Sequence, residues 1–322
     1  MFFLPFKVDL ELHRFPVITT LICLACIAIY MQQESSFQAF TNSIVSYCKS
    51  QADDSRFELV IQKASREDGP QGCPEIIYTL NSSETPEKDI QELSEKSAKI
   101  EAFPADYSRQ YVQEKLQEKF KQFQANHAVE DLTEKLIYKP ESYNVKNMIT
   151  AAFAHGSWSH IIGNLFFFFA FAASVEIALG FGAYALVFLT LAIGTHLSYS
   201  LSLLNVTDPM PTLGLSGVVM GMIGLFAFLM PTVKIRCVWW FLFIFRIVAI
   251  PAWILAAWYI GWDIYNLNHS DEQSNINFIA HVSGAIIGFL LGLIFFRQRK
   301  TEIKQELITH RETKNLGRAI TK

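Results

Sequence analysis

The chain has 322 residues, of which 51% are hydrophobic and only 18% charged, with a formal net charge of −3. Soluble domains usually carry about 25% charged residues, so this composition argues against an ordinary soluble protein. Asp, Glu, Lys and Arg are absent between Lys146 and Glu176, between Glu176 and Asp208, and between Asp208 and Lys234. Each interval is long enough for the ~20 apolar residues that cross a bilayer, which predicts a polytopic membrane protein.

The distribution of charge predicts an orientation in the membrane. Residues 33–147 hold 14 Lys and Arg against 20 Asp and Glu, whereas residues 297–322 hold 8 Lys and Arg against 3 Glu. Because Lys and Arg next to spans stay on the cytoplasmic side, we expect residues 297–322 to form a cytoplasmic basic tail. With six spans, the N-terminus at residues 1–15 is then cytoplasmic as well.

The first apolar run, residues 16–32, predicts transmembrane helix 1. A cleaved signal peptide is the competing interpretation. Asp9 and Glu11 precede the run, however, and no small-x-small cleavage site occurs near residue 35. We therefore expect an uncleaved helix.

Residues 33–147 predict an inserted domain outside the cytoplasm. The stretch 84–135 is rich in Glu, Lys and Gln and carries apolar residues such as Leu116 and Phe120 at helical spacing. This pattern predicts two or three amphipathic helices, so the insertion is mainly helical. The pattern of residues 51–82 is compatible with a β-strand in part of this stretch.

Two cysteines, Cys48 and Cys73, lie in the predicted inserted domain. A compartment outside the cytoplasm permits a disulfide between them. The sequence fixes no geometry for the pair, so it leaves the disulfide open.

Residues 148–296 read as a membrane core of five further spans. Lys234, Arg236 and Arg246 flank an aromatic-rich connection between the fourth and fifth spans, which is typical of a cytoplasmic interface. The predicted fold is an all-α membrane protein, a bundle of six transmembrane helices with the insertion between helices 1 and 2. We expect spans 2 to 6 at about 150–174, 183–203, 215–232, 247–262 and 278–296.

Polar groups inside spans are costly, and several fall at the outer ends of three spans. Ser216 begins the fourth span and His281 lies a few residues into the sixth. Glycines four residues apart follow both of them, and small residues at this spacing let membrane helices approach closely. A hydroxyl needs a neighbouring base to become a nucleophile, which predicts a catalytic pair of Ser216 and His281.

Acyl transfer also needs hydrogen-bond donors for the oxyanion. His160 and Asn164 are four residues apart and therefore share one helix face. We expect both to donate to the oxyanion together with the backbone N–H of Ser216, which Gly214 and Leu215 precede. His155, five residues before His160, is expected at the beginning of the helix, where it supports or lines the site.

No Asp or Glu is expected within a span where it could orient His281, so the sequence predicts a dyad and not a triad. Asp208 and Asp263 fall in loops at span ends, which argues against an aspartyl intramembrane protease. His155 and His160 are five apart without a carboxylate, unlike the histidines of a helical zinc motif. We expect no cofactor, no metal and no nucleic-acid partner.

Three motifs of this core occur in order and resemble the signature of the rhomboid intramembrane serine proteases over roughly residues 147–296. They are His155-x4-His160-x3-Asn164, Gly214-x-Ser216-Gly217 and Ala280-His281-x2-Gly284-x3-Gly288, with Val175-Glu176, Gly180 and Trp262-Asp263 as further similarities.

The resemblance implies a six-helix bundle with a water-filled cavity open to the outer side. It implies catalytic roles for Ser216 and His281 and oxyanion roles for His160 and Asn164. It also implies that the substrates are single-span membrane proteins in the lipid bilayer, cut near the outer end of a helix at small residues. Bacterial members have a short first loop with a Trp-Arg pair, whereas residues 33–147 are far longer and contain no Trp.

Two other functions compete with a protease. A non-catalytic relative that binds membrane clients generally lacks the Ser or the His, and both are present here. A small-solute transporter would favour duplicated halves, which are not visible. We expect a bacterial plasma membrane because no transit-type leader is seen, while sequons at Asn81, Asn205 and Asn268 leave a eukaryotic secretory membrane open.

Overall fold

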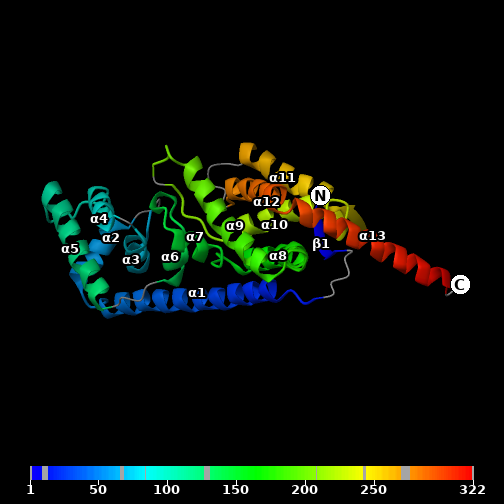
Figure 1. Cartoon of the computed structure of the whole chain (residues 1–322). Coiled ribbons are helices and arrows are strands. Elements are labelled where there is room, and N and C mark those ends of the chain that lie inside the picture. Colours follow the sequence, from blue (N-terminus) through cyan, green and yellow to red (C-terminus); the bar gives the residue numbers. More distant parts are fainter. Residues whose placement is uncertain are drawn as a thin grey trace. The chain divides into compact units, whose positions relative to one another are not determined.

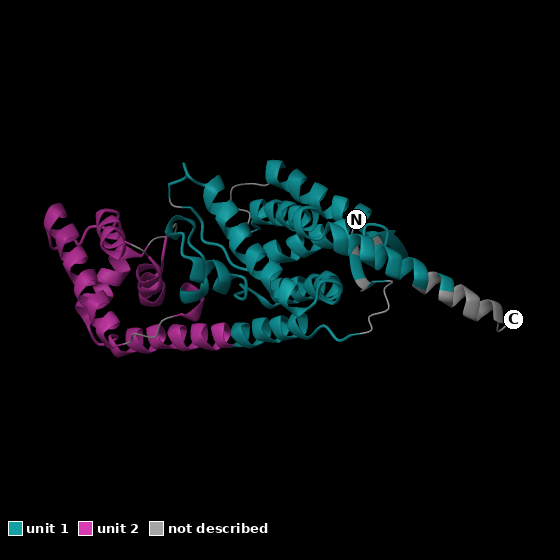
Figure 2. Cartoon of the chain, in the orientation of Figure 1, with its two compact units in different colours: residues 1–31, 135–322 teal, residues 32–134 magenta. Residues whose placement is uncertain are grey.

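The structure is a computed structural model in which the described residues are 2–8, 14–65, 69–83, 85–126, 131–207, 209–241, 244–269 and 276–320. The chain divides into two compact units (Figure 2). Unit 1 comprises residues 1–31 and 135–322, and unit 2 comprises residues 32–134. Residues 135–147, which the sequence assigned to the insertion, therefore belong with unit 1.

Unit 1 carries the apolar helices, which confirms an all-α membrane protein as the main architecture (Figure 1). Among the described residues, four helices are long and apolar enough to cross a membrane: α1 (Val17–Ser50), α8 (Trp158–Leu179), α9 (Phe181–Ser202) and α12 (Phe278–Phe295). The apolar helix α10 (Ser216–Leu229) is shorter. The fifth expected span corresponds to α11 (Ala252–His269), and the count of six spans stays a prediction.

Helix α10 is the centre of unit 1. It packs against α8, α9, α11 and α12, and twelve of its fourteen residues are buried. The surrounding helices bury one face and expose large apolar side chains on the other, among them Phe169, Leu186, Trp258 and Phe289. Such an exposed apolar surface suits contact with lipid tails, which accept apolar side chains as readily as a protein core does.

Two helices differ from their expected bounds. The first helix does not end at 32 but continues to Ser50, because no Gly or Pro interrupts it. The second span, expected at 150–174, is two helices, α7 (Val145–Ala151) and α8. The chain turns between them because the Ser157 side chain accepts a hydrogen bond from the backbone N–H of His160, 3.1 Å away, and so begins a new helix.

A small antiparallel sheet in unit 1 was not predicted. Its strands are β1 (Phe2–Val8), β2 (Lys234–Phe241) and β3 (Ile244–Pro251), in the order β1-β2-β3. The fifth span, expected at 247–262, therefore begins only at Ala252. The β-branched residues of β3 favour a strand over a helix, and apolar composition alone does not distinguish the two.

The remaining elements of unit 1 are short or follow the last span. They include a 3-10 turn at Pro140–Ser142 and α13 (Arg297–Ile320), which the predicted basic tail forms. Helix α6 (Leu132–Leu136) crosses the boundary between the units in sequence. At the start of α13, the Arg299 guanidinium donates to the carbonyl oxygen of Ala178 at the end of α8, 2.6 Å away, so a cation satisfies a helix C-terminus.

A buried carboxylate holds the beginning of α1. Glu176 of α8 is 6% exposed and accepts from the backbone N–H groups of Ile18 and Thr19, at 2.9 and 2.7 Å, and from the Thr19 hydroxyl. Helix N-terminal N–H groups have no partner within their own helix, and a negative charge there is favourable. Glu176 thus has a structural role at the beginning of α1.

Unit 2 is a separate helical body with its own apolar core. It contains the second half of α1 with α2 (Ser55–Ala64), α3 (Gly72–Ser82), α4 (Pro86–Glu95) and α5 (Ala105–Asn126). The described part of residues 51–82, for which the sequence left room for some strand, contains α2 and α3 joined by turns and irregular segments and no strand. The core side chains include Ile44, Val60, Ile76, Leu80, Val112, Leu116 and Phe123.

Two further contacts stabilise unit 2. Cys48 and Cys73 form a disulfide, which the sequence had left open, with 5.9 Å between their Cα atoms. The buried Lys119 ammonium lies 2.8 Å from the Asp54 carboxylate and over the Phe57 ring. The hydrogen bond from Lys119 lowers the pKa of Asp54 to about 2.

Helices α10 and α12 approach each other closely, and glycines make the contact. A Cβ atom added at Gly284 would collide with the carbonyl oxygen of Gly217, and one added at Gly288 would collide with that of Gly221. The expected close approach of these helices is confirmed. Because the paired residue numbers rise together, the two helices run parallel and their first turns lie at the same end.

We predict that Gly288→Ala destabilises the protein, since its new methyl group would meet backbone that cannot move aside cheaply. The expected loss in free energy of unfolding is about 2 kcal/mol or more, measured by reversible unfolding in detergent. Gly163→Ala is the matched control, because a Cβ there meets nothing within 4 Å. Equal stability of the two variants would contradict the described helix contact.

Candidate active site

Ser216 is the first residue of α10, and its side chain is partly buried. The N–H groups of a first helical turn have no acceptor within the helix and carry partial positive charge. An anion that forms beside Ser216 therefore meets favourable donors. Leu215, fully buried directly before the serine, anchors this helix end in the core.

The segment before Ser216 is held by backbone hydrogen bonds. The N–H of Gly214 donates to the carbonyl oxygen of Ala151, 2.8 Å away. Thr212 and Tyr138 form an antiparallel bridge, with N···O distances of 2.9 and 3.0 Å. The Asn277 side chain at the N-cap of α12 also donates to the Thr212 hydroxyl. The approach to Ser216 is thus fixed from α7 and from α12.

His160 and Asn164 lie beside Gly214. A Cβ atom added at Gly214 would be 2.8 Å from His160 Cε1 and 3.7 Å from Asn164 Nδ2. The φ angle of Gly214 is 120°, in the region that favours glycine, so both backbone conformation and space require this residue. The sequence placed His160, Asn164 and Gly214 in one site, and the structure brings them together.

The Asn164 side chain is 8% exposed, and within the described part of the chain its Nδ2 has no acceptor. Buried polar groups nearly always have a partner, and those without one often have a functional role. The Asn164 amide nitrogen lies next to Gly214, and Gly214 precedes Ser216 by two residues. It is therefore well situated to donate to a transient oxygen anion beside Ser216.

His155 lies in the turn that precedes α8, not within the helix. It is 1% exposed, its Nδ1 is 3.1 Å from the carbonyl oxygen of Phe153, and its ring packs edge-on against the His160 ring at 5.2 Å. His155 therefore supports the position of His160.

His281 lies in the first turn of α12. Gly284, three residues later on the same helix face, contacts the backbone of Gly217, which follows Ser216 directly. The glycine contact therefore brings the turn that carries His281 alongside the turn that carries Ser216.

The expectation that no carboxylate would orient His281 is wrong. Asp263 lies within α11, not in a loop, and is 9% exposed. Its Oδ2 is 3.1 Å from His281 Nδ1. The predicted end of the fifth span at residue 262 caused the error, because the helix extends to His269 and carries Asp263 inside it.

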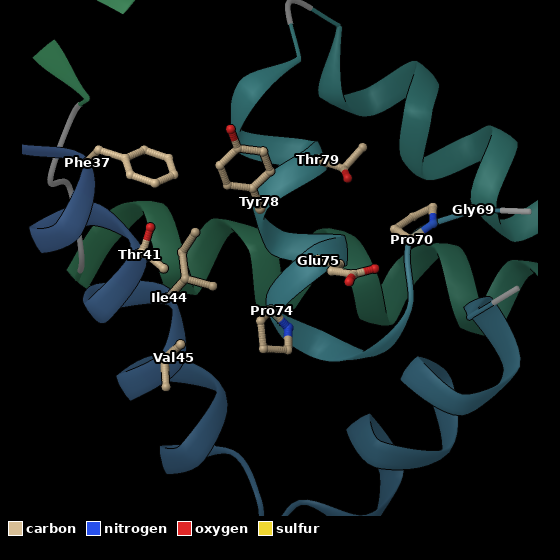
Figure 3. A pocket seen from close by; sticks show the side chains of 10 residues that line it. All are labelled: Phe37, Thr41, Ile44, Val45, Gly69, Pro70, Pro74, Glu75, Tyr78 and Thr79. Carbon is tan, nitrogen blue, oxygen red and sulfur yellow. The ribbon is translucent and has the colours of Figure 1, made fainter. Parts of the chain in front are cut away.

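A pocket in unit 2 contains none of these residues. Its volume is about 460 Å³, and Figure 3 shows side chains from α1 and α3 on its walls. Glu75 is the charged residue among those that line it, and its carboxylate accepts from the backbone N–H of Gln71. None of the candidate site residues lines this pocket, so it supplies no part of the chemistry considered below.

Comparison with protein families gives one match. The model of the Rhomboid domain matches residues 143–298, which confirms the resemblance expected over roughly 147–296. The matched range contains Ser216, His281 and the residues around Gly214. A comparison with curated proteins found no match to the chain.

Proposed function

Because the chain belongs to the rhomboid family, whose domain it carries at residues 143–298, we propose that it is an intramembrane serine endopeptidase. The family generally hydrolyses transmembrane substrates within the bilayer, although some members are inactive. The observation that carries the proposal is the glycine contact between α10 and α12. It brings the turns of Ser216 and His281 together, and both residues that the chemistry needs are present.

Ser216 is the nucleophile and His281 the base. The Ser216 Oγ attacks the carbonyl carbon of the scissile peptide bond while its proton passes to Nε2 of His281. The resulting tetrahedral carbon carries an oxyanion. The His281 proton then goes to the leaving amine nitrogen as the C–N bond breaks, which leaves an ester on Ser216. Water adds to this ester with the same proton transfers and releases the acid product.

The oxyanion is stabilised by donors from two elements. Asn164 Nδ2, which is buried beside Gly214 without an acceptor in the described structure, is one donor. His160 and the backbone N–H of Ser216 at the N-terminus of α10 are the others. Donors held before the reaction begins need no reorganisation, which is why such sites lower the barrier.

The chain is an integral membrane protein, and its proposed setting follows from charge. The basic residues of 297–322 favour a cytoplasmic C-terminus, and six spans favour a cytoplasmic N-terminus. Ser216 and His281 then face the outer side, where single-span substrates would be cut near the end of their helix. A disulfide between Cys48 and Cys73 supports an oxidising compartment for unit 2, in keeping with a bacterial plasma membrane.

We predict that Ser216→Ala and His281→Ala each abolish cleavage of a reporter transmembrane substrate while the protein still inserts and folds. The serine variant removes the nucleophile and the histidine variant removes its base, so kcat should fall by roughly 10³-fold or more. Cleavage is measured with purified protein in liposomes. Ser202→Ala, an exposed serine on α9, is the matched control and should retain full activity.

Persistent cleavage in Ser216→Ala would show that another residue is the nucleophile. If the wild type binds the reporter but leaves it intact, the non-catalytic client-binding function replaces the protease.

We also predict that Asn164→Ala lowers kcat by about 10²-fold with little change in KM. The amide is expected to donate to an oxygen that carries negative charge only in the transition state. Asn205→Ala, at an exposed turn, is the matched control. An Asn164→Ala variant with wild-type kcat would remove this residue from the oxyanion site.

A further inference from the structure

We propose that Asp263 is a positioning residue for His281, so that the catalytic machinery is a Ser216–His281–Asp263 triad and not a dyad. The inference rests on the proposed function, because it assigns a role to a residue that acts through the proposed base. Asp263 on α11 contacts His281 on α12, although the sequence predicted no carboxylate near this histidine.

The contact has the geometry of a directed hydrogen bond. Asp263 Oδ2 and His281 Nδ1 are 3.1 Å apart, and their side chains are 12% and 15% exposed. On α12 itself, the Phe278 ring packs edge-on near the imidazole, with 6.1 Å between ring centroids. The histidine ring is therefore held by a carboxylate at one nitrogen and by an aromatic ring.

This contact selects the tautomer that catalysis requires. A carboxylate can only accept, so the proton of the neutral imidazole resides on Nδ1. Nε2 is then left with a free electron pair, which is what a base for the Ser216 hydroxyl needs. Without the carboxylate, neither nitrogen is favoured, and a part of the molecules would carry the proton on the wrong one.

The carboxylate also favours the charged intermediate. When His281 takes the serine proton it becomes an imidazolium, and Asp263 provides a negative charge at hydrogen-bond distance. Because both groups are largely shielded from water, their attraction is stronger than it would be at an exposed site. The proton stays on the imidazole, and Asp263 orients and stabilises without taking it.

The burial of the Asp263 carboxylate also supports a functional role for this residue. A carboxylate inside a membrane helix is costly unless it is partnered. Asp263 lies on α11, whose other face exposes apolar side chains such as Trp258 and Ile264. Among the described residues, the polar partner of Asp263 is His281. A purely structural tether between α11 and α12 is the competing explanation, and it makes different predictions for kinetics and for the imidazole proton.

The test compares Asp263→Asn and Asp263→Glu with the wild type in liposomes. Asn keeps the size of Asp but its amide group donates to Nδ1, which favours the wrong tautomer. We expect Asp263→Asn to lower kcat roughly 10- to 1,000-fold with KM within about twofold. Asp263→Glu keeps the carboxylate and should recover part of the loss. Asp106→Asn, the same change at a side chain that is 99% exposed, is the control.

A second readout follows the proton directly. In protein labelled with ring-¹⁵N histidine, the His281 signal is assigned by its loss in His281→Gln. We expect the wild type to carry the proton on Nδ1 and Asp263→Asn to carry it on Nε2. A structural tether would leave the tautomer unchanged in any variant that remains folded.

The outcomes separate this inference from the proposed function. Wild-type kcat in Asp263→Asn, with cleavage that depends on Ser216, would overturn the triad and leave the protease in place. Cleavage that does not depend on Ser216 would overturn the proposed function, and the tautomer would then decide the role of Asp263 by itself. An unchanged tautomer in Asp263→Asn overturns the inference in either case.

Discussion

Backbone-to-backbone contact between α10 and α12 is the constraint on which the candidate site depends. Lipid tails are as apolar as the helices, so burial of apolar surface does not drive two membrane helices together. Close packing at small residues can do so, and the glycines at 217, 221, 284 and 288 provide it. Larger side chains at these positions would separate the helices, and the serine and histidine turns would separate with them.

Two buried carboxylates of unit 1 are tolerated because groups on other elements satisfy them. Glu176 accepts from the first N–H groups of α1, and Asp263 faces His281. Asn164 differs, because its amide nitrogen is buried without an acceptor in the described structure. The same membrane environment that makes such a group costly makes it an effective donor for an oxyanion, which links the energetics of the fold to its proposed chemistry.

Much of this arrangement could be predicted from local sequence. Charge-free intervals indicated membrane helices, and glycines at a four-residue spacing indicated the α10–α12 contact. The four-residue spacing of His160 and Asn164 indicated a shared helix face. These features are local and periodic, so they do not depend on knowing the tertiary structure.

Other features depend on the exact ends of elements or on contacts distant in sequence. Asp263 was missed because the end of α11 was set too early, and a helix end is weakly marked when apolar and aromatic residues continue past it. The sheet was missed because β1 pairs with a strand more than 200 residues away. The break before α8 depends on the Ser157 cap, and the disulfide depends on the approach of α3 to α1.

The most direct test of the account is covalent labelling of the detergent-solubilised wild-type protein with a fluorophosphonate, followed by mass spectrometry of its peptides. A fluorophosphonate reacts with a serine only where a base activates the hydroxyl and donors stabilise the charge on its oxygen. We predict an adduct on Ser216 and on no other serine, with labelling lost in His281→Ala. Absence of labelling, or an adduct on a different serine, would contradict it.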